Sequence, residues 1–302
     1  MKKDLFSYYC WGLNIMSELE CPELIDGEGP AAINVAMGST LGSLPDAEFR
    51  GVRYEMTQNQ FLLSVDNVAR YHVTNGNRIV VEPSPDANQQ AVRLFLLGSA
   101  CGALLQQRGL VPIHASVMEM GGRAVMFCGP SAMGKSTLAM TLYNRGYRML
   151  ADDVCAVRLD ETGLPLAIPG YPQFKLWADA LNVLKTADPT KLTNVRPGLE
   201  KYILDTRARF CRTDLPLKAI YFINRANNPS FELNPIRGKD KFIALFNNTY
   251  RVQFLDRLIN KSFHHRLCTA ITKHVDMFIL IRPDAPFQPE KLADLVEKDV
   301  FS

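Results

Sequence analysis

The sequence predicts an α/β fold in which a β-rich N-terminal domain precedes a larger domain built on a strand, glycine loop, helix and strand. Three observations predict it. Short alternating or β-branched runs fill roughly the first ninety residues, a glycine-rich loop separates an apolar strand from an apolar helix, and further apolar strands and a terminal helix follow. We expect domains at residues 1–88 and 110–302, connected by a helix over residues 89–109.

The N-terminal domain is expected to be a sheet. Runs such as AAINVAM, FLLSVD and RIVVEP are separated by the turn-prone segments IDGEGP and TNGN. Apolar residues then recur at helical spacing from Gln89 to Arg108, and Gly109 follows, which predicts the connecting helix. Its stretch LFLLGSACGALL is about a dozen residues long, too short to cross a bilayer, and we interpret it as a buried helix.

The second domain is expected to begin with a hairpin. VPIHASVMEM and AVMFC read as two strands joined by a turn at Gly121 and Gly122. STLAMTLYNRG then predicts a helix ending at Gly146, and RMLADDVCAV predicts one strand with two aspartates inside it. QFKLWADALNVL suggests a helix, KAIYFIN and VDMFILI suggest buried strands, and PEKLADLVEKDVF suggests a terminal helix.

Composition excludes several classes of protein. The 302 residues carry a net charge of +3 from 34 basic and 31 acidic side chains, without the basic runs of a nucleic-acid tail. The N-terminus lacks the apolar core of a signal peptide, and seven widely spaced cysteines form no zinc pattern. We therefore expect a cytoplasmic protein with neither a nucleic-acid nor a membrane partner; homo-oligomerisation stays open.

The string GPSAMGKS matches the phosphate-loop pattern GxxxxGK[ST] at every fixed position. Gly129 and Gly134 permit backbone conformations that turn N–H groups inward toward phosphate oxygens. Lys135 would place a charge on the β and γ phosphates, and Ser136 would offer a hydroxyl to Mg²⁺, so ATP and Mg²⁺ are the expected cofactors. The expected phosphate contacts form one run: Gly129, Pro130, Ser131, Ala132, Met133, Gly134, Lys135, Ser136 and Thr137.

Asp152 and Asp153 lie in an otherwise apolar run, where burial of two carboxylates is costly unless a cation compensates. Mg²⁺ would provide that compensation. Neighbouring residues of a strand point to opposite faces, so only one aspartate would meet the metal unless the strand ends or bulges there. His114, on the strand before the loop, fits a buried core histidine as well as a functional one.

The stretch from His114 through GPSAMGKS to LADDV resembles the catalytic domain of HPr kinase/phosphorylase, the bacterial enzyme that phosphorylates a serine of the carrier protein HPr. Nearly the whole chain, including PGYPQFKLW and RPGLEKY, is similar to HPr-kinase-like proteins of peptide natural-product gene clusters, among them kinases that modify lasso peptide precursors. The resemblance implies the P-loop fold shared with phosphoenolpyruvate carboxykinase.

The resemblance also implies roles for individual residues. His114 and Lys135 would be catalytic, Asp153 would be the general base, Ser136 would bind the metal, and Asp152 would orient or bind it. The implied activity is that of a serine kinase, which transfers the γ-phosphate of ATP to a hydroxyl of a peptide or protein. A lasso-type precursor peptide is one candidate acceptor.

One departure from the family pattern matters. The ExRGxG loop that carries a magnesium-binding glutamate is absent, and PGYPQFKLW stands in roughly that place. The second metal ligand therefore stays open, and HPr itself and the reverse dephosphorylation are not expected. VRPGLEKY puts Arg196 and Lys201 around a turn, where they could contact phosphate or a substrate carboxylate or form a solvated surface. Arg251 is a similar candidate.

Two rival functions use the same residues. One is a kinase for a small molecule, and the other is a protein that binds nucleotide and peptide without phosphate transfer. Intact His114, Lys135, Ser136 and Asp153 favour catalysis, because a pure binding protein needs no base. The missing glutamate favours the binding protein.

Overall fold

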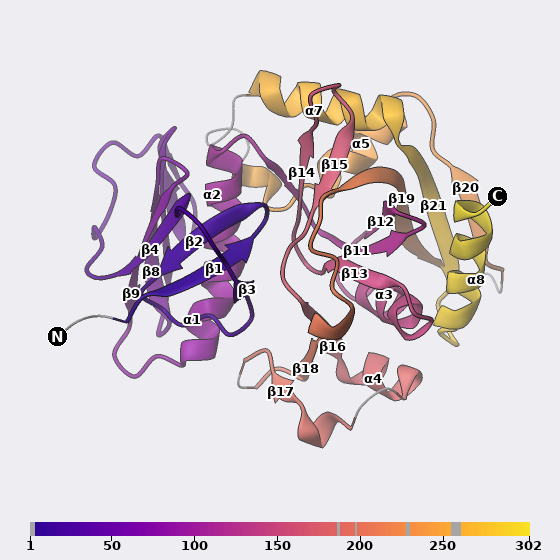
Figure 1. The fold of residues 1–302 in the computed structure, drawn as a ribbon, viewed down its shortest axis with the longest axis horizontal. Coiled ribbons are helices and arrows are strands. Elements are labelled where there is room, and N and C mark those ends of the chain that lie inside the picture. The colour runs from indigo at the N-terminus through magenta and orange to yellow at the C-terminus, as the bar shows by residue number, and fades with distance from the viewer. Residues whose placement is uncertain (1–3, 186–187, 197, 228–229, 255–260) are drawn as a thin grey trace. The chain divides into compact units, whose positions relative to one another are not determined.

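The structure is a computed structural model that describes residues 4–185, 188–196, 198–227, 230–254 and 261–302. It is a mixed α/β fold (Figure 1) with two compact units. One unit comprises Met1–Pro112 and Tyr250–Arg266, and the other comprises Ile113–Thr249 and Leu267–Ser302. In this division the helical segment after residue 88 is part of the first unit.

The first unit contains a nine-stranded sheet in the order β3-β1-β2-β4-β9-β8-β7-β6-β5, which confirms that the N-terminal region is rich in strands. Its strands are β1 (Phe6–Cys10), β2 (Leu13–Ser17), β3 (Ile25–Asp26), β4 (Ile33–Met37), β5 (Phe49–Arg50), β6 (Tyr54–Met56), β7 (Gln60–Val65), β8 (Ala69–Thr74) and β9 (Arg78–Pro83). Alternate residues of β8 and β9 are buried, as in a sheet with one face on a core.

The predicted helix after residue 88 is present, and it has three parts. α1 (Gln89–Phe95) is followed by the π-helical turn η1 (Leu96–Ala100) and by α2 (Cys101–Gln107). Its apolar stretch is buried, as predicted. Within the described ranges, the structure contains no helix of the length and hydropathy that a membrane crossing requires.

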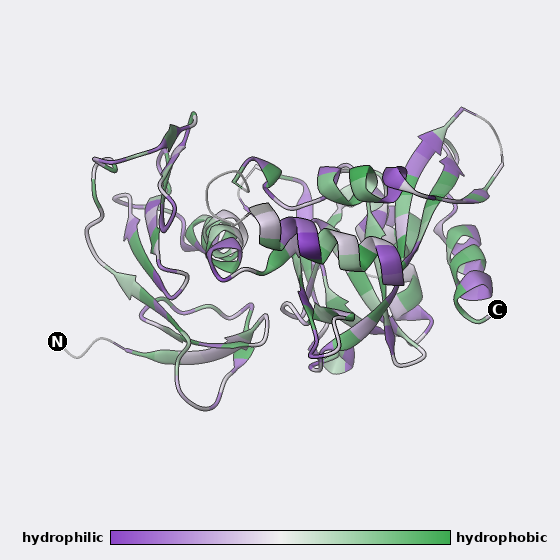
Figure 2. Cartoon of the chain, turned by 90° about the horizontal axis from the view of Figure 1, so that it is seen from above, coloured by the Kyte–Doolittle hydropathy of each residue, from purple (hydrophilic) through white to green (hydrophobic). Residues whose placement is uncertain are grey.

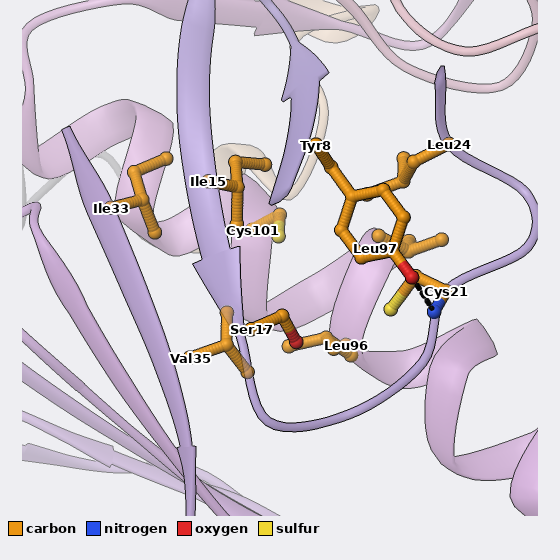
Figure 3. A pocket seen from close by; sticks show the side chains of 10 residues that line it. All are labelled: Tyr8, Ile15, Ser17, Cys21, Leu24, Ile33, Val35, Leu96, Leu97 and Cys101. Atoms are coloured by element: carbon orange, nitrogen blue, oxygen red, sulfur yellow. Dashed lines mark hydrogen bonds between the residues drawn. The ribbon is translucent and has the colours of Figure 1, made fainter. Parts of the chain in front are cut away.

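An apolar hollow lies between this helix and the strands of the first unit (Figure 3). The Tyr8 hydroxyl at its rim accepts a hydrogen bond from the Cys21 backbone N–H at 2.8 Å. The hollow is lined by Tyr8, Ile15, Ser17, Cys21, Leu24, Ile33, Val35, Leu96, Leu97 and Cys101.

A short segment near residue 250, distant in sequence from the N-terminal strands, also belongs to the first unit. The Phe254 ring centroid lies 4.9 Å from that of Tyr54 and 4.7 Å from that of Phe61, and Phe254 is only 2% exposed. The Gln106 amide donates to the Tyr250 carbonyl at 3.0 Å. Residues near 250 are therefore bound to the N-terminal sheet and its helix by both apolar and polar contacts.

The second unit contains a mixed sheet in the order β14-β15-β19-β12-β11-β13, with β21 beside β19 and β20 beside β21. Strand β12 is parallel to β19, and β19 is parallel to β21. The strands are β11 (Ala115–Met120), β12 (Arg123–Cys128), β13 (Arg148–Ala151), β14 (Cys155–Leu159), β15 (Pro165–Ile168), β19 (Leu215–Ala226), β20 (Glu232–Pro235) and β21 (Asp276–Pro283). β10 (Val111–Ile113) stands at the unit boundary. The hairpin of β11 and β12 is confirmed, as are the apolar strands β19 and β21.

The helices that follow the glycine loop carry both hydrophobic and hydrophilic residues along their lengths (Figure 2). They are α3 (Lys135–Asn144), α4 (Ala178–Leu184), α5 (Lys239–Asn247), α7 (Lys261–His274) and α8 (Pro289–Val300). Leu138 and Leu142 of α3 are fully buried in one core with Val296 of α8 and Phe127 of β12. The predicted helices after the glycine loop and at the C-terminus are therefore confirmed, and burial of their apolar faces fixes them on the sheet.

Two sequence predictions were wrong. RMLADDVCAV is not one strand, because β13 ends before the aspartates and β14 begins after them; β13 pairs with β11 and β14 with β15. QFKLWADALNVL is not one helix, because β16 (Gln173–Trp177) precedes α4. β16 forms a small sheet with β18 (Lys201–Asp205), which also pairs with β17 (Thr193–Asn194). Burial of Phe174 and Leu176 in the core explains the strand, since alternate residues share a face.

Candidate functional site

The glycine loop connects β12 to α3 and has the backbone that its sequence predicts. Gly129 has φ 135° and Gly134 has φ 103°, conformations that side chains disfavour. A Cβ at Gly129 would lie 2.8 Å from the Ile223 carbonyl oxygen, and one at Gly134 would lie 2.7 Å from Cζ of Phe287. Glycine is therefore required at both positions by conformation and by space.

Neighbouring residues brace the loop. Nε of Arg282 donates to the Met133 carbonyl at 3.0 Å, and the guanidinium lies 4.2 Å from the centroid of the Phe287 ring. The exposed part of the loop comprises Pro130, Ser131 and Ala132. Since α3 begins at Lys135, the free N–H groups and the positive dipole end of the helix lie at this loop, an arrangement that suits an anion.

The Lys135 side chain is buried within the loop. Its ammonium donates to the carbonyls of Gly129 at 2.7 Å and Pro130 at 3.0 Å. Burial lowers the pKa of Lys135, although the charge of Asp152 opposes the shift. The next residues, Ser136 and Thr137, lie in the first turn of α3, and Thr137 is buried. The loop thus holds the ammonium group of Lys135 at its centre.

Asp152 is buried and joins the loop to the strands. Its Oδ1 accepts hydrogen bonds from the hydroxyls of Ser136 at 2.9 Å and Ser116 at 2.5 Å, and its Oδ2 accepts one from the backbone N–H of Lys175 at 3.0 Å. A hydroxyl and a carboxylate are oxygen donors of the kind that Mg²⁺ prefers. Ser136 and Asp152 therefore fit the expected metal, although the described residues hold no group of three or more His, Cys, Asp or Glu arranged for a metal ion.

Asp153 is held by two basic side chains. Nδ1 of His114 lies 3.3 Å from its Oδ1 and 2.9 Å from its backbone carbonyl oxygen, and Nζ of Lys175 lies 3.2 Å from its Oδ2. Burial alone would raise the pKa of Asp153, but Lys175, His114 and Lys201 outweigh it and hold this pKa well below its ordinary value. The carboxylate therefore stays ionised.

The backbone explains how both aspartates face the same region. β13 stops at Ala151, and Asp153 has φ 77°, a left-handed conformation that is uncommon outside glycine. The opposite-face alternation of a strand therefore does not apply to them. The strand end, which the sequence left as one alternative, is the arrangement in the structure. Backbone strain of this kind clusters at functional sites.

Contacts of both the backbone and the ring hold His114 in place. Its N–H donates to the Asn248 carbonyl at 2.9 Å, and Ile113 bridges to Thr249. The side chain is partly exposed, at 32%, beside Asp153, so the fully buried core histidine is not what the structure shows. The structure thus brings together the regions of His114, Lys135, Ser136, Asp152 and Asp153.

The two basic residues around the turn, Arg196 and Lys201, lie in different surroundings. Lys201 on β18 places its ammonium 5.6 Å from the Trp177 ring centroid. Its charge contributes to lowering the pKa of Asp153 and that of Lys135. Arg196 is exposed in a bend before the turn. Arg251 belongs to the first unit, where it donates to the Ser99 hydroxyl at 3.0 Å.

Sequence reasoning missed two residues of this cluster. Lys175 contacts both aspartates, and Ser116 donates to Asp152. Lys175 also donates to the Tyr171 hydroxyl at 3.0 Å. The alternation of Gln173, Lys175 and Trp177 with two apolar residues was the available signal, because it places the lysine on the face of a strand opposite the core.

Comparison with known proteins finds two curated relatives that match part of the chain. The chain is similar to HPr kinase/phosphorylase. It is 28% identical to the Chlorobium phaeovibrioides protein of that name over 107 residues, 31% of this chain and 32% of that protein. A Geobacillus HPr kinase/phosphorylase is 35% identical over 52 residues, 17% of each chain. The matches thus span about a third and a sixth of these relatives and support a relationship to the HPr kinase/phosphorylase family.

Family models and solved structures give two further comparisons. No protein-family model matches the chain. The solved structure of the Hpr(Ser) kinase/phosphatase from Coxiella burnetii aligns with 63% of this chain and 90% of its own, with a TM-score of 0.35 and 11% identity.

Proposed function

We propose that the chain is a kinase that uses ATP and Mg²⁺ to phosphorylate a serine hydroxyl of a peptide or protein. One observation carries the proposal: the hydroxyl of Ser136, beside the loop lysine, donates to Asp152, whose neighbour Asp153 is held by His114 and Lys175. A phosphate-binding loop and an oriented carboxylate in one cluster are the parts that phosphoryl transfer needs.

Binding is assigned to the loop. The backbone N–H groups of residues 129–137 and the start of α3 would surround the phosphates, and Lys135 would turn its ammonium from the loop carbonyls toward them. Ser136 and Asp152 would hold Mg²⁺, which supplies charge neutralisation on the phosphate oxygens when bound.

The chemistry is assigned to Asp153. Its carboxylate accepts the proton of the acceptor hydroxyl while that oxygen bonds to the γ-phosphorus. The bond from the γ-phosphorus to the β,γ-bridging oxygen breaks, and ADP leaves. His114 and Lys175 orient the carboxylate through its two oxygens. The low pKa of Asp153 keeps its carboxylate ionised, which is the form that accepts a proton from the hydroxyl.

The acceptor is assigned from the sequence. The similarity of PGYPQFKLW and RPGLEKY to kinases of peptide gene clusters favours a peptide, and a lasso-type precursor is our preferred acceptor. Lys201, whose charge contributes to lowering the pKa of Asp153, would meet phosphate or a substrate carboxylate. Arg196 is retained as a weaker contact.

The test is a phosphotransfer assay. The full chain is incubated with ATP, Mg²⁺ and synthetic serine-containing precursor peptides, and added phosphate is detected by peptide mass. We expect a gain of one phosphate on serine that the Lys135→Ala variant does not produce. Transfer only to small alcohols would support the small-molecule kinase, and ATP binding without transfer to any acceptor would support the binding protein.

A further inference from the structure

The backbone of Lys175 is fixed by the core of the second unit. On β16 its neighbours Phe174 and Leu176 pack into that core and are 0% and 1% exposed. Strand alternation then points Lys175 to the other face, toward the aspartates. The side chain is itself buried, with 8% exposed. A lysine in this position is a fixed part of the cluster and has little freedom to leave it.

Lys175 contacts both carboxylates, and it does so at their Oδ2 atoms. Its ammonium lies 3.2 Å from Oδ2 of Asp153 and its backbone N–H donates to Oδ2 of Asp152 at 3.0 Å. The Oδ1 atoms face other partners: Ser136 and Ser116 for Asp152, and His114 for Asp153. The two carboxylates are therefore in different environments, one among hydroxyls and one among basic groups.

Charge separates the two environments further. An ammonium on Asp153 already neutralises that carboxylate, and a divalent cation there would be repelled at short range by Lys175. Asp152 is 2.9 Å from a neutral hydroxyl, which would join it as a metal ligand without repulsion.

We infer that Lys175 is a built-in second cation of this site, so that the nucleotide-bound chain holds one divalent ion, on the Ser136 and Asp152 side. The inference rests on the proposed function, since it concerns the nucleotide complex. Lys175 is a positioning residue: it holds Asp153 for the acceptor hydroxyl and occupies the place that a second metal ion would take.

The test counts metal ions. The full chain is saturated with a non-hydrolysable ATP analogue and titrated with Mn²⁺, and free Mn²⁺ is measured by electron paramagnetic resonance. We expect one bound Mn²⁺ per chain. Lys175→Gln removes the positive charge and adds an amide oxygen beside Asp153, so we expect this variant to bind a second Mn²⁺. Lys175→Arg keeps the positive charge, so we expect it to bind one Mn²⁺, as the wild type does. Lys298→Gln, which removes an exposed lysine of α8 outside the site, should also retain one.

The outcomes separate the two hypotheses. Two Mn²⁺ ions in the wild-type complex overturn the inference, and so does a single ion in a folded Lys175→Gln chain that binds the analogue normally. If Lys175→Gln does not fold, the wild-type count decides. Absence of both analogue and Mn²⁺ from the wild-type chain would instead refute the proposed function.

Discussion

The Ser136 hydroxyl donates to Oδ1 of Asp152 over 2.9 Å, although one residue lies in the first turn of α3 and the other follows β13. This bond connects the glycine loop to the acid pair. It gives the two aspartates different neighbours, and the different neighbours make the roles of Asp152 and Asp153 separable by experiment.

Lys135→Ala should weaken ATP binding roughly ten- to a hundredfold, because it removes a charge-assisted contact worth about 1.5–3 kcal/mol. Isothermal titration calorimetry measures the change directly. Lys298→Ala, which removes an exposed lysine of α8, is the matched control and should bind ATP as the wild type does. Equal affinity in all three chains would contradict the loop's assignment.

Asp153→Asn keeps the shape of the side chain but cannot accept a proton. ATP should still bind, while phosphotransfer should fall by roughly 10²–10⁴-fold, the usual contribution of a general base. Single-turnover measurements at saturating ATP separate this loss from binding. A near-normal rate would show that another group, or water, accepts the proton.

Asp152→Asn should act on the metal. We expect weaker nucleotide binding that depends on Mg²⁺, with part of the rate recovered as Mg²⁺ is raised, because a carboxylate ligand has been lost beside Ser136. Titration of both aspartate variants with Mg²⁺ compares the roles. If extra Mg²⁺ rescues Asp153→Asn instead, the two assignments must be exchanged.

Gly134→Ala should distort the loop, since its methyl group would lie 2.7 Å from the Phe287 ring in a backbone of φ 103°. We expect loss of ATP affinity and a lower melting temperature. Gly163→Ala is the control: it also has positive φ, 87°, but no atom lies within 4 Å of the added methyl. The control should show only the conformational cost of about 1–2 kcal/mol, and Phe287→Leu should restore part of the Gly134→Ala loss.

Phe254→Ala should destabilise the first unit by about 3–5 kcal/mol, the usual cost of removing a buried aromatic ring. The ring is 2% exposed between Tyr54 and Phe61. Denaturant unfolding measures the loss. Phe301→Ala, at a position 57% exposed, should cost far less, and equal losses would show that the Phe254 ring adds little to this core.

Much of the fold could be predicted because its signals are local. The glycine loop, the hairpin through Gly121 and Gly122 and the helix α8 each follow from turn residues or apolar spacing within about a dozen positions. The strand break at the two aspartates could not be predicted, since the apolar run continues across them and the left-handed backbone of Asp153 depends on tertiary contacts.

The residues of the candidate site were easier to predict from the sequence than the contacts between them. His114, Lys135, Ser136 and both aspartates were selected by pattern and resemblance, and the structure gathers them. Lys175 was missed because ADALNVL, a strong helical pattern, follows QFKLW directly and extended the predicted helix backward over β16. Cross-strand pairing with β18, distant in sequence, fixes that segment instead.

The chain passes from the first unit to the second and back, because Tyr250–Arg266 belongs to the first unit and Leu267–Ser302 to the second. A fragment that began at Leu110 would still carry Phe254, but without the rings of Tyr54 and Phe61 that cover it. In evolutionary terms, a single recombination event could not transfer either unit intact, because each unit consists of two separate stretches of the chain. We therefore expect the two units to be inherited together.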